Sequence, residues 1–204
     1  MLRLIDALDR ALSDDVVSPI DTPPFHQSAV DGYAFSFKDW DGKSKLEVAG
    51  EVQAGNVFTA EIKPRQAIRI FTGAPVPAGL DTVVMQEKIE VQGDQMTIKD
   101  PLLVAGANVR LQGSQTKIGD VVLKKSHRLT PASISFLASL GITEVPVFAH
   151  PHIRIIVTGK ELVAPGGTIN EGQIFESNSF ALKTALKAMG ISPCLLYTSD
   201  AADE

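Results

Sequence analysis

The sequence predicts an α+β protein of more than one domain, in which a β-rich domain is inserted into a small α/β domain and the start of a parallel α/β domain follows. Three observations support this fold class. Apolar segments of strand length, separated by turn residues, fill residues 27–120. A helix signal follows at 130–141, and a strand–loop–helix pattern occupies 153–190.

The same pattern predicts the domain boundaries. We expect residues 1–26 and 121–150 to form a discontinuous first domain, because these segments can pair around the β-rich insertion at 27–120. Residues 151–193 would be the incomplete start of the parallel α/β domain. A single strand and helix cannot bury their own apolar faces, so we expect this stub to be mobile or sticky.

Composition narrows the classes of function. The chain has 204 residues, 44% of them hydrophobic, which suffices for one large or two small cores. Its net charge of -5, without a basic cluster, argues against nucleic acid as the main partner. No apolar run approaches the roughly 20 residues that span a bilayer, and the N-terminus lacks a signal-peptide pattern. With one cysteine, we expect no disulfide framework. The lack of a long apolar run and of a signal-peptide pattern leads us to expect no membrane partner and a cytoplasmic protein.

The first segment has helical spacing. Apolar residues recur every three or four positions between Leu2 and Leu12, which predicts a helix over 2–12. Residues 18–25 contain three prolines and predict an extended connector, because proline fixes φ and disfavours helix at the preceding residue.

Strands and turns alternate through the β-rich segment. Residues 46–49 and 67–71 alternate or run apolar over strand length, and a further strand region lies within 81–91. Gly93-Asp94 is a hairpin turn signal. Residues 121–123 form another short apolar run.

The clearest helix signal follows. Thr130 is a candidate N-cap, Pro131 suits the first helical position and Gly141 is a natural C-terminal stop, so we expect a helix over 130–141. Residues 143–148 predict a short strand, which its proline places at a sheet edge.

The last region has the pattern of a βαβ unit. Residues 153–157 predict a buried strand, 160–176 a long loop, and Asn178 lies near the start of a helix that Gly190 ends. An incipient strand at 191–193 completes the opening of a parallel α/β domain.

The final segment, 194–204, differs from what precedes it. Its residues can be back-translated into a sequence that resembles a transposon adapter used to prepare sequencing libraries. We therefore expect an adapter-derived artefact that completes no structural element, with the natural protein continuing past Pro193; a genuine C-terminus is the alternative.

Two segments place polar residues where apolar runs end. Asp31 lies in an Asp-Gly pair, which is consistent with an ordinary turn or with a binding carboxylate at a loop tip. Thr72 and Gly73 follow the apolar run 67–71. They suit either a capped loop or a site where the backbone approaches an anion.

Two further segments allow similar alternatives. Asn108-Val109-Arg110 offers an arginine that forks onto phosphate or carboxylate, or a plain surface arginine. Thr158-Gly159-Lys160-Glu161 lies at the predicted carboxyl end of a parallel strand, where open α/β sheets place ligands, or forms an ordinary turn. The four histidines show no zinc-like arrangement, so no metal-ligating residue is predicted.

Taken together, these segments resemble the molybdopterin molybdenumtransferase (MoeA) family, which includes the E domain of gephyrin. The third domain would then be of the molybdopterin-binding type. The matching segments, in the family's order, are Asp15-Val16-Val17-Ser18-Pro19, Ser28-Ala29-Val30-Asp31-Gly32-Tyr33-Ala34, Thr72-Gly73-Ala74-Pro75-Val76-Pro77, Asp81-Thr82-Val83-Val84-Met85-Gln86-Glu87, Gly106-Ala107-Asn108-Val109-Arg110, Ala138-Ser139-Leu140-Gly141 and Thr158-Gly159-Lys160-Glu161-Leu162.

The resemblance implies an activity for the parent protein, namely insertion of molybdate into adenylylated molybdopterin with release of AMP, giving the molybdenum cofactor. It implies Mg²⁺, and a homodimer whose cleft lies between one subunit's β-rich domain and the partner's α/β domain. The molybdopterin adenylyltransferase is a further implied partner. The implied catalytic residues are Asp31, Thr72 and Glu161; the implied substrate-binding residues are Gly73, Asn108, Arg110, Thr158 and Gly159.

The chain also departs from the family pattern. Gly113-Ser114-Gln115 stands where the family has Gly-Glu-Asp, which removes two carboxylates from the implied cleft. Later α/β motifs would lie beyond Pro193, so we expect a fragment truncated within the α/β domain and inactive in molybdate insertion by itself. The alternative function is a non-catalytic dimeric binding or scaffold homologue of the same fold.

Overall fold

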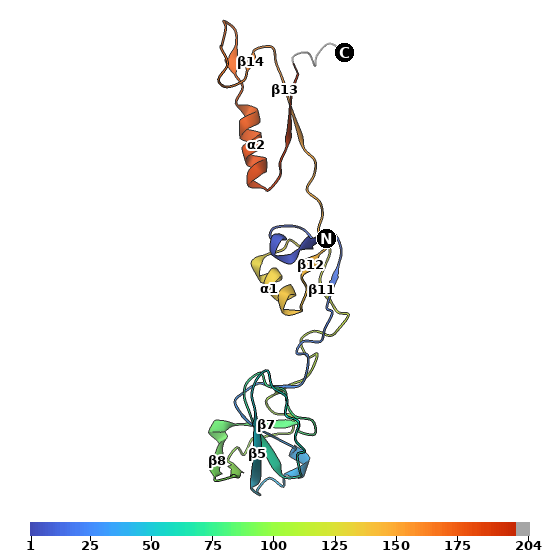
Figure 1. Ribbon diagram of the computed structural model, residues 1–204, viewed down its shortest axis with the longest axis vertical. Helices are drawn as coiled ribbons and strands as arrows, with labels where there is room; N and C mark the ends of the chain where they lie inside the picture. The colour runs from blue at the N-terminus through green and yellow to red at the C-terminus, as the bar shows by residue number, and fades with distance from the viewer. Residues whose placement is uncertain (199–204) are drawn as a thin grey trace. The chain divides into compact units, whose positions relative to one another are not determined.

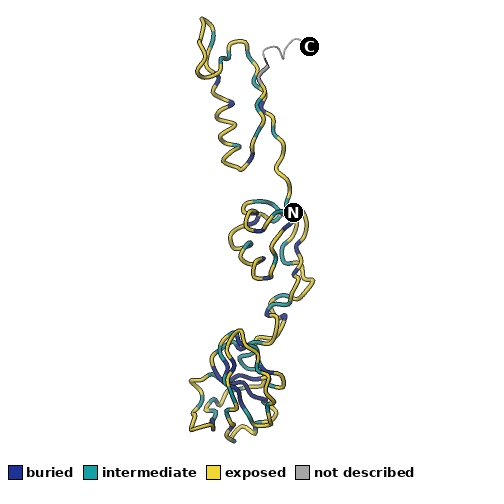
Figure 2. Tube along the Cα trace, viewed as in Figure 1, coloured by how far each residue is buried: buried dark blue, intermediate teal, exposed yellow. Residues whose placement is uncertain are grey.

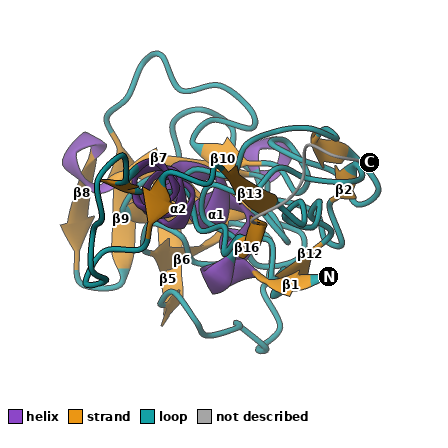
Figure 3. Cartoon of the chain, turned by 90° about the horizontal axis from the view of Figure 1, so that it is seen from above, coloured by secondary structure: helices purple, strands orange, loops and turns teal. Residues whose placement is uncertain are grey.

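The computed structural model describes residues 1–198 and divides the chain into two compact units, Met1–Val147 and Phe148–Glu204 (Figure 1). Short strands joined by long loops make up most of both units (Figure 3). The elements of the first unit are β1 (Leu2–Arg3), the 3-10 helix η1 (Leu4–Asp6), β2 (Val16–Val17), β3 (Gln27–Ser28), β4 (Gly32–Phe35), η2 (Phe37–Asp39), β5 (Leu46–Val52), β6 (Gln66–Ile70), β7 (Thr82–Met85), η3 (Gln86–Lys88), β8 (Ile89–Gln92), β9 (Gln95–Ile98), β10 (Val109–Arg110), β11 (Val121–Leu123), α1 (Pro131–Ser139) and β12 (Glu144–Val145). Those of the second are β13 (Arg154–Thr158), β14 (Leu162–Val163), β15 (Ile174–Phe175), α2 (Asn178–Ala188) and β16 (Cys194–Thr198).

A six-stranded sheet forms the centre of the β-rich segment, in the order β7-β4-β6-β5-β9-β8. Neighbouring strands are antiparallel except β5 and β6, which are parallel. The strands expected at 46–49 and 67–71 are confirmed as β5 and β6, and the region 81–91 contains β7 and β8. Gly93-Asp94 joins β8 to β9 as the predicted hairpin.

Each face of this sheet carries a cluster of buried apolar side chains, and buried residues gather in the β-rich part of the chain (Figure 2). Successive residues of a strand point to opposite faces, so neighbours along β4 and β6 fall into two separate clusters. One cluster contains Tyr33, Phe35, Leu46, Ala67, Val84 and Met96, and the other contains Ala34, Val52, Ile68, Ile70, Ala74 and Val83.

Gly32 allows β4 to lie between its two neighbours. A Cβ added at this position would lie 2.0 Å from the carbonyl oxygen of Val84 in β7. Because Gly32 pairs with Ile70 on one side and Met85 on the other, strand packing requires the glycine of the Asp-Gly pair.

The chain segments on either side of the β-rich region pair with each other. β1 pairs with β12 and β2 with β11, both antiparallel. This pairing is compatible with the discontinuous first domain expected for 1–26 and 121–150, whose boundaries stay a prediction. The hydrophobic cluster that these segments build contains Leu4, Ala7, Leu12, Val16, Leu129, Leu137, Leu140 and Val145.

The helix predicted over 2–12 is wrong. Only Leu4–Asp6 form a single 3-10 turn, and Asp9 has φ of 63°, which an α-helix does not accommodate. The backbone instead bonds to distant segments: Leu4 N donates to Thr143 O at 2.8 Å and Asp9 N to Leu129 O at 2.9 Å. Tertiary pairing therefore overrides the local apolar periodicity.

The predicted helix at 130–141 is confirmed as α1. Thr130 Oγ1 accepts a hydrogen bond from Ser133 N at 3.2 Å, Pro131 occupies the first turn, and Gly141 has φ of 77° just after the helix. These are the cap, start and stop that the sequence predicts.

The second unit contains the predicted βαβ arrangement, because β13 pairs in parallel with β16 and α2 lies between them in the chain. Three expectations need correction. The strand at 153–157 is not fully buried, since Ile155 is 9% exposed but Ile156 is 60% exposed. The loop 160–176 contains two short parallel strands, β14 and β15.

The third correction concerns the tail. Residues 194–198 form β16, so this part of the tail does complete an element by hydrogen bonding to β13. Residues 199–204 lie outside the described residues, and the adapter origin of 194–204 stays a prediction.

Candidate functional site

Asp31 and Thr72 lie next to each other at the start of β4 and just past the end of β6. Asp31 Oδ1 accepts two hydrogen bonds from Thr72, one from the backbone N at 2.8 Å and one from Oγ1 at 2.7 Å. Antiparallel pairing of Gly32 with Ile70 produces this proximity, because it aligns the residues before β4 with those after β6. The structure thus brings together two of the residues to which the resemblance gives catalytic roles.

The two hydrogen bonds also keep Asp31 ionised. The pKa of its carboxyl lies below the ordinary value, chiefly because of the Thr72 backbone N–H, then because of the Thr72 hydroxyl, with the Arg69 charge contributing less. Asp31 is exposed, and no hydrogen bond to its Oδ2 is found among the described residues. One carboxylate oxygen therefore holds the loop while the other faces solvent.

Backbone bonds fix the loop that carries Gly73. Gly73 N donates to Ser28 O at 2.9 Å, and Ser28 N donates to Ala74 O at 3.0 Å. Gly73 has φ of 83°, in the left-handed region that glycine adopts readily. Ser28 is fully buried and its Oγ donates to Val30 O at 2.6 Å, so this serine of the Ser28–Ala34 motif has a structural role.

Asn108 and Arg110 lie against the same segment. Asn108 Nδ2 donates to Val83 O at 2.9 Å, and Asn108 O accepts from Ala29 N at 2.9 Å. The Asn108 side chain is therefore used to hold β7 and the site loop together. Arg110 is exposed on β10, and no ion pair involves it in residues 1–198, so its guanidinium can reach an anion.

The other three predicted residues form a group within the second unit. Thr158 ends β13, and Gly159 follows it with φ of 143°. A Cβ at Gly159 would lie 2.8 Å from Glu161 Oε1, so the Glu161 carboxylate folds back over the glycine. The strand end thus presents a carboxylate beside exposed backbone, as the position after a parallel strand suggests.

Comparison with known proteins points to the same family as the motifs in these loops. The family described as "MoeA N-terminal region (domain I and II)" matches residues 2–141. The chain belongs to the MoeA family. It is 40% identical over 188 residues to the molybdopterin molybdenumtransferase of Haemophilus influenzae, covering 92% of this chain and 46% of that protein. It is 35% identical over 206 residues to molybdopterin molybdenumtransferase 2 of Mycobacterium tuberculosis, covering 98% of this chain and 50% of that protein.

Solved structures give the same fold. A molybdopterin biosynthesis MoeA protein from Pyrococcus horikoshii superimposes with a TM-score of 0.87 and 32% identity, over 98% of this chain and 52% of that one. A second crystal structure of MoeA from P. horikoshii OT3 gives 0.83 and 36%, over 100% of this chain and 55% of that one. The predicted fold class is thereby confirmed, and the chain spans about half the length of these relatives.

This MoeA chain has one basic residue beside the site that sequence reasoning missed. Arg69 lies on β6, two residues before Phe71, and its charge contributes to the lowered pKa of Asp31. The signal that reveals it is strand alternation, which places Arg69 on the same face as Tyr33, but only once the register of β4 and β6 is known.

Residues 1–198 of the MoeA chain lack two kinds of feature. No group of three or more His, Cys, Asp or Glu side chains in this part could hold a metal ion. No described helix is long and apolar enough to cross a membrane.

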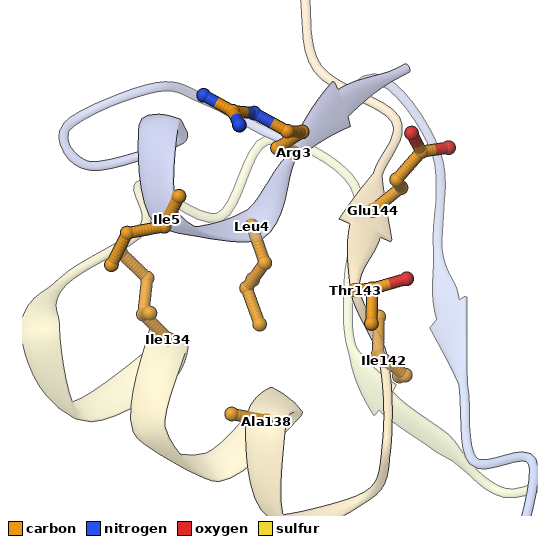
Figure 4. Close-up of a pocket in the computed structure, with 8 residues that line it drawn as sticks. All are labelled: Arg3, Leu4, Ile5, Ile134, Ala138, Ile142, Thr143 and Glu144. Carbon is orange, nitrogen blue, oxygen red and sulfur yellow. The ribbon is translucent and has the colours of Figure 1, made fainter.

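A separate apolar cavity of about 510 Å³ lies beside η1 and α1 in this MoeA chain. Leu4, Ile5, Ile134 and Ala138 point toward it, whereas the Arg3 guanidinium points away (Figure 4). None of the predicted site residues lines this cavity.

Proposed function

We propose that the protein to which this chain belongs acts in molybdenum cofactor biosynthesis, as a molybdopterin molybdenumtransferase that inserts molybdate into adenylylated molybdopterin and releases AMP. The observation that carries the proposal is the bonding of Asp31 to Thr72 in a chain of the MoeA family. Relatives of which this chain covers about half bear the name molybdopterin molybdenumtransferase.

The proposal gives each site residue a task. Asp31 fixes Thr72 and offers Oδ2 to the substrate, while Thr72 and Gly73 offer backbone and hydroxyl donors to an oxyanion. Arg110 binds a phosphate group, because it is exposed and without an ion pair among the described residues. Asn108 supports the loop. Thr158, Gly159 and Glu161 belong to the α/β side of a cleft that a homodimer would complete.

Further parts of the proposal rest on the resemblance alone. These are the homodimer, the molybdopterin adenylyltransferase as a partner, Mg²⁺ and a cytoplasmic location. The described residues do not fit a Mg²⁺ site by themselves, because no three carboxylate or imidazole groups converge and Asp31 Oδ1 is taken by Thr72. We therefore assign no step of the reaction to the ion.

The Gly113-Ser114-Gln115 segment favours a second function, a non-catalytic dimeric binding or scaffold homologue. The backbone N of Gln115 donates to Thr22 O at 2.9 Å, so this turn keeps its structure without the two acidic side chains of the family pattern. A scaffold would retain affinity for adenylylated molybdopterin and show no turnover.

The test uses the full-length protein that contains this chain, purified and supplied with molybdate and adenylylated molybdopterin. Asp31→Ala should lower turnover about 100-fold, because it removes the acceptor of both Thr72 bonds and misplacing Thr72 by about 1 Å suffices for a loss of that size. Asp41→Ala is the matched control, since Asp41 also accepts bonds from a backbone N and a hydroxyl, those of Ser44. Binding without turnover in the unmutated protein would establish the scaffold function instead.

A further inference from the structure

One face of the β-rich sheet ends in an exposed polar and aromatic patch next to Asp31. Arg69 of β6 pairs with Tyr33 of β4 on one side and with Glu51 of β5 on the other. Asp31 precedes Tyr33 by two residues and Phe71 follows Arg69 by two. Strand alternation therefore puts all these side chains on one face.

A bulge in β5 sets this arrangement. The register between β5 and β6 shifts between Val48 and Gly50, so that Glu51 rather than Gly50 lies opposite Arg69. The opposite face at Gly50 is filled by Phe58, whose ring would lie 2.8 Å from an added Cβ. The bulge thus directs the Glu51 carboxylate to the side of the sheet where Arg69 lies.

The Arg69 guanidinium lies over an aromatic ring. Its Cζ lies 5.2 Å from the centroid of the Phe71 ring, and its Nε lies 3.5 Å from Glu51 Oε2. The side chains of Arg69 and Glu51 remain 43% and 45% exposed, so this ion pair adds little to stability and leaves much of the Arg69 side chain accessible. A guanidinium plane supported in this way is a surface on which flat heterocycles stack.

Hydrogen-bonding groups lie beside the Arg69 and Phe71 pair. Gln53 Nε2 donates to Glu51 Oε1 at 3.1 Å. Carboxylate and carboxamide groups together can accept from and donate to the amino and ring-nitrogen edge of a heterocycle.

We propose that Glu51, Gln53, Arg69 and Phe71 form a platform that binds a flat amino-heterocycle of the adenine or pterin type. This rests on the proposed function, whose substrate carries both kinds of ring. The local charge favours a neutral ring over a free phosphate, because the single guanidinium of Arg69 lies beside two carboxylates, Glu51 and Asp31. Stacking on Arg69 supplies the affinity, and Glu51 reads the ring edge.

The experiment uses the 204-residue chain and three probes: adenosine, pterin and ribose 5-phosphate. Ligand-observed NMR and calorimetry measure their binding to the unmutated chain and to Arg69→Lys, which keeps the charge but loses the plane. At least one ring probe should bind, and Arg69→Lys should weaken that binding at least tenfold. Arg65→Lys, an exposed arginine outside the patch, is the matched control and should leave it unchanged.

Glu51→Gln and Phe71→Leu provide independent variants, should Arg69→Lys alter the fold. Each should weaken ring binding several-fold while the urea midpoint stays that of the unmutated chain. Three results would overturn the proposal: no ring probe binds, Arg69→Lys and Arg65→Lys act alike, or ribose 5-phosphate competes for the site. Absence of molybdate insertion by the full-length protein would refute the proposed function alone, because ring binding is measured without turnover.

Discussion

The β-rich sheet and the second unit both contain large apolar side chains, which are buried in the sheet and largely exposed in the second unit. In the sheet, Phe35 and Ile68 are fully buried, because each face of β4 and β6 meets a layer of apolar side chains. In the second unit, α2 leaves Phe180 52% and Met189 67% exposed. A parallel strand pair with one helix has too few layers to cover its apolar side chains. Burial, rather than apolar content, therefore distinguishes the two regions.

The largest expected effect tests this contrast directly. Phe35→Ala should cost about 4 kcal/mol, because it empties a fully buried site in contact with Trp40, whereas Phe180→Ala should change stability by less than about 0.5 kcal/mol. Native-state amide hydrogen exchange measures the opening free energy of β6 and of α2 in the same sample. Equal losses for the two variants would show that α2 is as well packed as the sheet.

A second substitution examines how tightly the sheet strands approach. Gly32→Ala would place a Cβ 2.0 Å from the Val84 carbonyl oxygen, so β4 and β7 must separate at a cost of about 3 kcal/mol. Trp40, which packs in the sheet core, reports unfolding by fluorescence during a urea titration. Gly55→Ala is the control, since its added Cβ meets nothing within 4 Å and only its φ of 88° opposes it, at about 1 kcal/mol. Equal midpoints for the two variants would contradict the close approach.

Much of the sheet and α1 could be predicted because the determinants are local. Gly93-Asp94 specifies its hairpin by its own conformational preference, and Thr130 and Pro131 specify the start of α1. The helix prediction for residues 2–12 was wrong because the conformation of this segment depends on distant residues. Its backbone bonds to Thr143 and Leu129, partners more than a hundred residues away that no local periodicity identifies.

The residues of the candidate site also separate into those that a local motif identifies and those that depend on distant strands. Asp31 and Thr72 were found through the motifs that carry the family resemblance, and the structure then showed their hydrogen bonds. Arg69 lies just before Thr72 in one of the two segments singled out in the sequence, but no chemical role was predicted for it. Its place beside Glu51 depends on the bulge after Val48, which shifts the pairing of β5 and β6 by one residue. A register that two distant strands set together cannot be read from either strand alone.

A third prediction compares the N-termini of the two helices. Thr130→Ala should destabilise α1 by about 1 kcal/mol, because it removes the acceptor of the Ser133 amide. Ser177→Ala at the corresponding position of α2 should have almost no effect, since its side chain makes no capping bond. Hydrogen exchange in the first turn of each helix measures both. A comparable loss in α2 would mean that Ser177 does cap it in solution.

The smallest expected effect concerns how α2 is capped instead. Glu176 is only 3% exposed, and its Oε1 accepts from Ser179 N at 2.6 Å while Oε2 accepts from the Ser179 hydroxyl. These bonds, first that of the hydroxyl and then that of the amide, lower the pKa of Glu176 below its ordinary value. A lowered native pKa means that the bonds contribute fully at neutral pH and are lost as the pH falls through that native value.

Acid should therefore loosen the first turn of α2 while the apolar sheet of the first unit persists. The measurement is the pH dependence of the Ser179 amide chemical shift and of its hydrogen exchange, compared with those of Ile68 in β6. Glu176→Gln should abolish the acid-dependent change at Ser179, because a carboxamide still accepts the amide bond but does not titrate. Glu171→Gln, an exposed carboxylate in the same unit, should retain it. A transition at Ser179 that survives in Glu176→Gln would assign the pH response of α2 to a different group.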